Sequence, residues 1–185
     1  DLVAVITSTH VSDDAIERCC IENSIPCFRG NLDDVLDRYY QAARHFEVET
    51  VVRITADCPL LDPIIVNKVV NAFNDGTYDY VSNTLECTYP DGLDTEVFRF
   101  STLEKAWKEA VWKSEREHVT AYIRKHPELF RLCAVKHTVD LSALRWTVDT
   151  PPDLQFVRAV YAGSACDKFG MEDVLHFIKD HPEIA

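Results

Sequence analysis

Two aspartates follow apolar segments directly, at positions where a carboxylate could do chemistry. Asp57 comes after the predicted strand 50–55, and Asp149 comes after an apolar segment that ends at Val148. In open α/β sheets, ligands bind beyond the carboxyl ends of the strands. Mg²⁺ prefers one or two carboxylates together with waters and phosphate oxygens, so this pair could hold the ion against a phosphorylated ligand. The alternative is that both aspartates only cap the helices that follow them, because Pro follows both sites.

Three further places carry polar side chains with two interpretations each. Asp94 and Glu96 follow a Pro-Asp-Gly turn and could accept hydrogen bonds from sugar hydroxyls or form surface salt pairs. His118 could contact a substrate or be a histidine at the edge of the core, bonded to backbone. Arg38 could contact a base or phosphate, or pair with an aspartate in its own helix.

The elements that must position these residues alternate along the chain. Predicted strands cover 2–7, 26–28, 50–55, 78–82, 95–100 and 132–138. Predicted helices cover 13–23, 33–46, 63–73, 101–111, 115–125, 150–161 and 171–180. We expect the helix from residue 101 to open on a capping box made by Ser101 and Glu104. This order predicts an α/β fold with a mostly parallel sheet, helices on both faces, and one domain over residues 1–185.

Composition excludes several classes of protein. A net charge of −12 disfavours a nucleic-acid-binding surface, which needs basic residues to displace counterions. The seven cysteines are odd in number and show no C-x-x-C spacing, which favours reduced thiols in the cytoplasm over disulfides or a zinc ribbon. No apolar run approaches the roughly 20 residues of a membrane span. The sequence has no G-x-S-x-G, H-E-x-x-H or Walker motif.

Six segments together resemble the spore-coat polysaccharide biosynthesis protein F family of cytidylyltransferases, which are related to the CMP-KDO and CMP-sialic acid synthetases. They are TSTHVSDDAI, FRGNLDDVLDRYY, VVRITADCPLLDP, YPDGLDTEVF, REHVTAYI and RWTVDTPPDL. The resemblance implies a Rossmann-like nucleotidyltransferase fold. It also implies a reaction in which a hydroxyl of a sugar or sugar acid attacks the α-phosphate of CTP and pyrophosphate leaves.

The resemblance also assigns roles to residues of this sequence. Asp57 and Asp149 match the family's two catalytic carboxylates that hold Mg²⁺. The residues that match the border of the nucleotide are Ser8, Asn31, Asp34 and Arg38. The residues that fall where the acceptor sugar would lie are Asp94, Glu96 and His118.

One departure from the family pattern leads to a further expectation. Family members begin with a strand and a Gly-, Arg- and Lys-containing loop that wraps the triphosphate, whereas this chain starts at what would be the next strand. We therefore expect the chain to bind triphosphate weakly and to catalyse poorly. Two alternative functions stay open: a non-catalytic binding domain on the same fold, or a glycosyltransferase that uses a sugar nucleotide.

The apolar and aromatic helix from Leu103 to Trp112 is a possible homodimer interface, or part of the core.

Overall fold

The computed structural model describes residues 2–164 and 169–183. The chain divides into two compact units. The first unit comprises residues 1–51 and 98–131, and the second comprises residues 52–97 and 132–185. Whether the two act as one domain stays a prediction, and each unit is described by itself.

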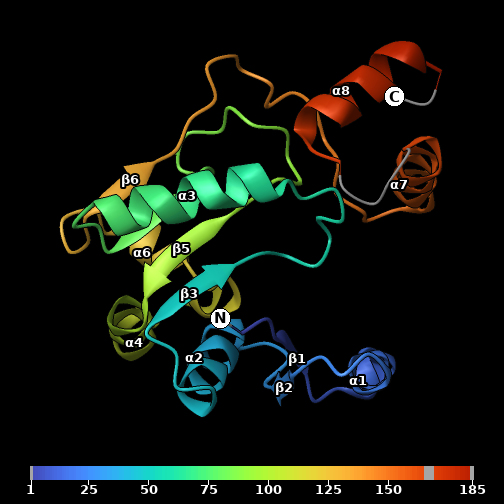
Figure 1. Cartoon of the computed structure of the whole chain (residues 1–185). Coiled ribbons are helices and arrows are strands. Elements are labelled where there is room, and N and C mark those ends of the chain that lie inside the picture. The colour runs from blue at the N-terminus through green and yellow to red at the C-terminus, as the bar shows by residue number, and fades with distance from the viewer. Residues whose placement is uncertain (1, 165–168, 184–185) are drawn as a thin grey trace. The chain divides into compact units, whose positions relative to one another are not determined.

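The first unit is built around two parallel strands. β1 (Val5–Ser8) pairs with β2 (Cys27–Gly30) from Val5 opposite Cys27 to Ser8 opposite Gly30. A short 3₁₀ turn, η1 (Val11–Asp13), leads from β1 into the first α-helix. The helices α1 (Asp14–Glu22) and α2 (Val35–His45) both contact the two strands, and they lie on opposite sides of them in Figure 1. This arrangement confirms the predicted alternation of strands and helices.

Three further helices belong to the first unit, and two predictions about them are wrong. α4 (Phe100–Glu109) begins at Phe100, with Arg99 as its N-cap and no side-chain cap, so Ser101 lies inside the first turn and no capping box forms. The predicted helix 115–125 is two helices, α5 (Lys113–Glu117) and α6 (Ala121–Lys125). The break contains Val119 and Thr120, which are buried and β-branched, and β-branched residues favour helix less than unbranched ones do.

The second sheet has four strands in the order β3 (Thr50–Arg53), β5 (Glu96–Arg99), β4 (Tyr80–Ser82) and β6 (Leu132–Ala134). β4 and β6 are parallel, with Tyr80 opposite Leu132, while the arrow of β5 points opposite to that of β3 (Figure 1). The helix α3 (Pro63–Asp75) packs on β4 through Val69 and Phe73, which cluster with apolar side chains of the sheet. The α/β fold is confirmed, although most strands are shorter than predicted.

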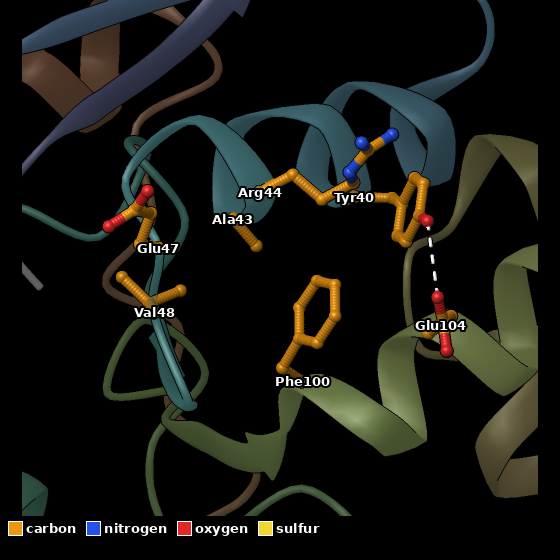
Figure 2. A pocket seen from close by; sticks show the side chains of 7 residues that line it. All are labelled: Tyr40, Ala43, Arg44, Glu47, Val48, Phe100 and Glu104. Atoms are coloured by element: carbon orange, nitrogen blue, oxygen red, sulfur yellow. Dashed lines mark hydrogen bonds between the residues drawn. The ribbon is translucent and has the colours of Figure 1, made fainter.

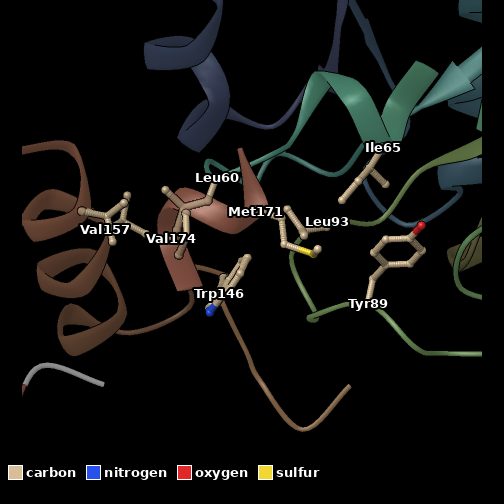
Figure 3. Packing of buried hydrophobic residues seen from close by; sticks show 9 residues of the cluster. Leu60, Ile65, Tyr89, Leu93, Trp146, Val157, Met171 and Val174 are labelled. Carbon is tan, nitrogen blue, oxygen red and sulfur yellow. The ribbon is translucent and has the colours of Figure 1, made fainter. Parts of the chain in front are cut away.

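A hydrophobic cluster in the second unit fixes the loops that carry the predicted site (Figure 3). Its members are Leu60, Ile65, Tyr89, Leu93, Trp146, Val157, Val160, Met171 and Val174, and the last four belong to α7 (Pro151–Gly163) and α8 (Met171–Asp180). Leu60, Leu93 and Trp146 each lie within three residues of a candidate aspartate. Burial of these anchors therefore holds three separate loops in place. Among the described helices, none is long and apolar enough to cross a membrane.

Candidate active site

Backbone hydrogen bonds join the three loops of the second unit that carry the candidate aspartates. The amide of Val148 donates to the carbonyl of Asp57 at 2.9 Å, and the amide of Trp146 donates to the carbonyl of Asp91 at 2.7 Å. Gly92 makes the second junction possible: its φ is +110°, and a Cβ there would lie 2.9 Å from the carbonyl carbon of Trp146. The loops after β3, before β5 and before α7 thus form one connected surface.

Asp57 is a half-buried carboxylate with few hydrogen-bond partners among the described residues. It receives one weak contact, from the Cys58 thiol at 3.6 Å, and no Lys, Arg or His in the described part of the chain pairs with it. It does not cap α3, because Asp62 is the N-cap and accepts from the amide of Ile64 at 2.7 Å. The capping alternative for Asp57 is therefore wrong.

Asp149 is exposed, and its carboxylate is already paired with the guanidinium of Arg145. It does not cap α7 either: Thr150 is the N-cap, and Asp153 completes a capping box. Asp153 accepts hydrogen bonds from the amides of Asp149 at 3.0 Å and Thr150 at 2.7 Å. These bonds, that from Asp149 foremost, lower the pKa of Asp153 to about 2. The turn that carries Asp149 is thus fixed by a side chain other than its own.

Asp94 is half-buried, as Asp57 is, whereas Asp149 is exposed. Burial, followed by the negative charges of Asp91, Glu96 and Asp57, raises the pKa of Asp94 to about 6. The mutual repulsion shows that the carboxylates of these loops are close enough to interact electrostatically. An excess of negative charge at this place favours a cation.

Glu96 is buried, and both of its oxygens have partners inside the protein. Tyr80 donates its hydroxyl to one oxygen at 2.5 Å, and Arg53 pairs with the other. The alternative of a salt pair at the surface is therefore wrong for Glu96, because its ion pair with Arg53 is largely enclosed. Its contact with an acceptor sugar stays a prediction.

The nucleotide candidates Ser8, Asn31 and Asp34 lie in the first unit, and each makes internal hydrogen bonds. Ser8 is buried and donates its hydroxyl to Asp13 at 2.6 Å. Asn31 accepts from the amides of residues 33 and 34 at 2.8 and 3.0 Å. Asp34 caps α2 by accepting from the amide of residue 37 at 2.9 Å, and it also binds Arg116 through two guanidinium nitrogens. The contacts of Asn31 and Asp34 shape the segment between β2 and α2, and that of Ser8 lies between β1 and α1.

Arg38 and His118 also belong to the first unit. Arg38 donates to the carbonyl of Asn31 at 3.0 Å, its Nε is buried without a partner among the described residues, and burial lowers its pKa. The alternative of a salt pair within its own helix is wrong for the described residues, and Asp34 binds Arg116 instead. His118 ends α5 as an exposed residue, so the interpretation as a core-edge histidine is wrong. Contacts of both residues with ligands stay predictions.

A shallow hollow of about 300 Å³ also lies in the first unit, and Figure 2 shows its lining. Its walls are Tyr40, Ala43, Arg44, Glu47, Val48, Phe100 and Glu104. The Tyr40 hydroxyl donates to Glu104 at 3.3 Å across one side (Figure 2), and the Tyr40 ring stacks on Trp107 with 4.1 Å between centroids. None of the predicted site residues lines it.

Comparison with known sequences gives a consistent picture. A family model described as Cytidylyltransferase matches residues 1–161. An uncharacterized protein of Methanocaldococcus jannaschii is 34% identical over 186 residues, covering 100% of this chain and 75% of that protein. The spore coat polysaccharide biosynthesis protein SpsF of Bacillus subtilis is 30% identical over 192 residues, covering 100% of this chain and 78% of that protein.

Solved structures agree with the sequences. A cytidylyltransferase from Leptospira borgpetersenii superimposes with a TM-score of 0.92 at 31% identity, covering 98% of this chain and 77% of that one. A CMP:2-keto-3-deoxy-manno-octonic acid synthetase complexed with CTP gives a TM-score of 0.60 at 14% identity, over 86% of this chain and 81% of that one. The second likeness concerns the fold alone.

Proposed function

Because the chain belongs to the cytidylyltransferase family, we propose that it transfers cytidine monophosphate from CTP to a hydroxyl of a sugar or sugar acid and releases pyrophosphate. The observation that supports this most is Asp57, a carboxylate after β3 that caps no helix and pairs with no cation of the described chain. The hydrogen bond from Val148 joins its loop to that of Asp149. A use in surface polysaccharide synthesis is proposed from the relative SpsF, whose name carries that role.

The charges of the second unit suit a divalent cation. Asp57 would hold Mg²⁺ together with Asp149, and the ion would neutralise phosphate oxygens of the bound triphosphate. No cluster of three or more His, Cys, Asp or Glu suited to a metal occurs among the described residues, and Mg²⁺ does not require one, since waters and phosphate complete its shell. The negative charge of Asp57 is one of those that raise the pKa of Asp94, so a cation bound at Asp57 would offset that charge.

The protein's own groups would act by position rather than by covalent chemistry. Asp94 would accept a hydrogen bond from the acceptor hydroxyl, while the buried Glu96–Arg53 pair holds the start of β5 and with it the Asp94 loop. Phosphoryl transfer depends mainly on such alignment and on charge neutralisation. We propose that Arg38, Asn31 and Ser8 border the nucleotide, the part that the resemblance assigns to them.

The test is a screen of the natural gene product that contains this chain, with Mg²⁺, four nucleoside triphosphates and a panel of sugars and sugar acids. We expect pyrophosphate release with CTP that depends on an acceptor. Asp57→Asn should lower the rate at least about 100-fold, as removal of a group that stabilises transition-state charge does, with the circular dichroism spectrum unchanged. Asp75→Asn, an equal charge change on an exposed residue of α3, should leave the rate intact. Release by Asp57→Asn at the wild-type rate would refute the proposed site.

Two further properties are proposed with this function. We propose a cytoplasmic location, supported by the free thiols of all six described cysteines, and cell fractionation tests it.

We also propose a homodimer. Leu103 is fully buried and belongs to the core, so the interface is assigned instead to Val111 and Trp112, which are 80% and 69% exposed just after α4.

A further inference from the structure

We propose that Arg145 holds the place of the divalent cation at Asp149 and must release that carboxylate when the metal binds. This inference rests on the proposed function, in which Asp57 and Asp149 share a magnesium ion. It assigns Arg145 as a positioning residue that sets the affinity of the site for metal.

Arg145 lies among three carboxylates of the second unit. Its Nη2 pairs with Asp149, its Nη1 lies 3.2 Å from Asp153, and its Nε lies 3.9 Å from Asp91. A guanidinium presents several donors in a fixed plane and can serve more than one carboxylate at once. Arg145 therefore keeps anionic partners even if Asp149 leaves it.

The two proposed metal ligands differ in whether a cationic side chain already pairs with them. The carboxylate of Asp57 has no cationic partner within the described chain, whereas that of Asp149 is neutralised by Arg145. Asp149 lies on an exposed turn whose backbone is held by Asp153, so its side chain can exchange partners without unfolding the turn. Arg145 pairs with Oδ2 of Asp149, so a metal that binds this oxygen has to displace the guanidinium.

This exchange lowers the affinity for metal. Arg145 competes for one ligand and adds a positive charge beside the site, and both effects oppose a cation. Both side chains are partly exposed, 44% for Arg145 and 60% for Asp149, so water weakens the pair. Loss of an exposed ion pair of this kind changes the affinity for metal about two- to fivefold.

The experiment measures binding of Mn²⁺ alone to the natural gene product by electron paramagnetic resonance, with Mg²⁺ as competitor. Arg145→Gln should bind Mn²⁺ about two- to fivefold more tightly than the wild type. Arg145→Lys keeps the charge and loses the planar fork, so its affinity should fall between the two. Arg158→Gln removes an equal charge from an exposed position of α7 and should not change the affinity.

The outcomes separate this inference from the proposed function. Unchanged or weaker Mn²⁺ binding by Arg145→Gln overturns the exchange at Asp149, provided that Asp57→Asn abolishes binding. Retained Mn²⁺ binding by Asp57→Asn instead overturns the metal site itself. If Arg145→Gln fails to fold by circular dichroism, the affinity of Arg145→Lys decides, and a value equal to that of the wild type refutes the inference.

Discussion

Asp62 shows how one buried carboxylate can organise two helices at once. Its Oδ1 accepts from the amide of Ile64 at the start of α3, and its Oδ2 accepts from the amide of Met171 at the start of α8. The positive ends of both helices thus meet the same negative charge. Gly170 stands against it so closely that a Cβ there would lie 2.7 Å from Oδ2.

Replacing Asp62 by Ala should destabilise the protein by about 2–3 kcal/mol, the sum of one lost cap and one unpaired buried amide. Urea denaturation followed by circular dichroism measures the free energy of unfolding. Asp75→Ala, on an exposed position of the same helix, should stay within about 0.5 kcal/mol of the wild type. An equal loss in the two variants would contradict a capping role for Asp62.

Asp13 gives a dependence of stability on pH. Hydrogen bonds from the hydroxyls of Ser8 and Thr7 and from the Ser8 amide hold the pKa of Asp13 well below its ordinary value of 3.8. A carboxylate whose pKa is lower in the folded state stabilises the fold above its unfolded pKa and loses this effect as pH falls. The contribution should be complete at pH 7 and decline from about pH 4 downward.

We therefore expect Asp13→Asn to unfold at lower urea concentration than the wild type at pH 7, with the difference shrinking from pH 4 to pH 2.5. Asp33→Asn, an exposed aspartate of the same unit, supplies the control for the change in charge. A difference between Asp13→Asn and the wild type that stays constant over this range would show that the carboxylate charge is not involved.

At the scale of elements, Gly92 is the residue on which the junction of the site loops depends. A side chain there meets both a positive φ and the backbone of Trp146. Gly92→Ala should cost about 1–3 kcal/mol in unfolding free energy. It should also lower the rate of pyrophosphate release, because the Asp91 and Asp94 loop moves. If this variant keeps the stability and the rate of the wild type, the junction of the loops does not depend on Gly92.

Local patterns predicted the helices whose apolar spacing is regular, and the bounds of α1, α2, α3, α7 and α8 agree with the sequence to within about two residues. The break at residues 118–120 escaped prediction because the β-branching of Val119 and Thr120 lowers helix propensity only slightly, and the apolar spacing continues across it. The sequence also indicated Asp57 as a candidate. It could not indicate that Asp34 binds Arg116, 82 residues away, because nothing local marks that contact. Arg145 could have been noticed, since it precedes Asp149 by four residues.

At the scale of the whole molecule, the proposed homodimer depends on the exposed pair Val111 and Trp112. Trp112→Glu should convert a dimer into a monomer in multi-angle light scattering, because a charge would be buried at the interface. Val139→Glu introduces the same charge at another exposed apolar position and should leave the mass unchanged. A wild-type protein that elutes as a monomer would rule out the dimer.

The burial of Trp146 has an optical consequence. The chain has three tryptophans, and they differ in surroundings: Trp146 is 2% exposed beneath the loops of the candidate site, Trp112 is 69% exposed, and Trp107 stacks on Tyr40. With Trp107 and Trp112 replaced by Phe, the remaining indole would emit at short wavelength and resist quenching by iodide. Its fluorescence would then report directly on the loops around Asp57 and Asp149 when a ligand arrives.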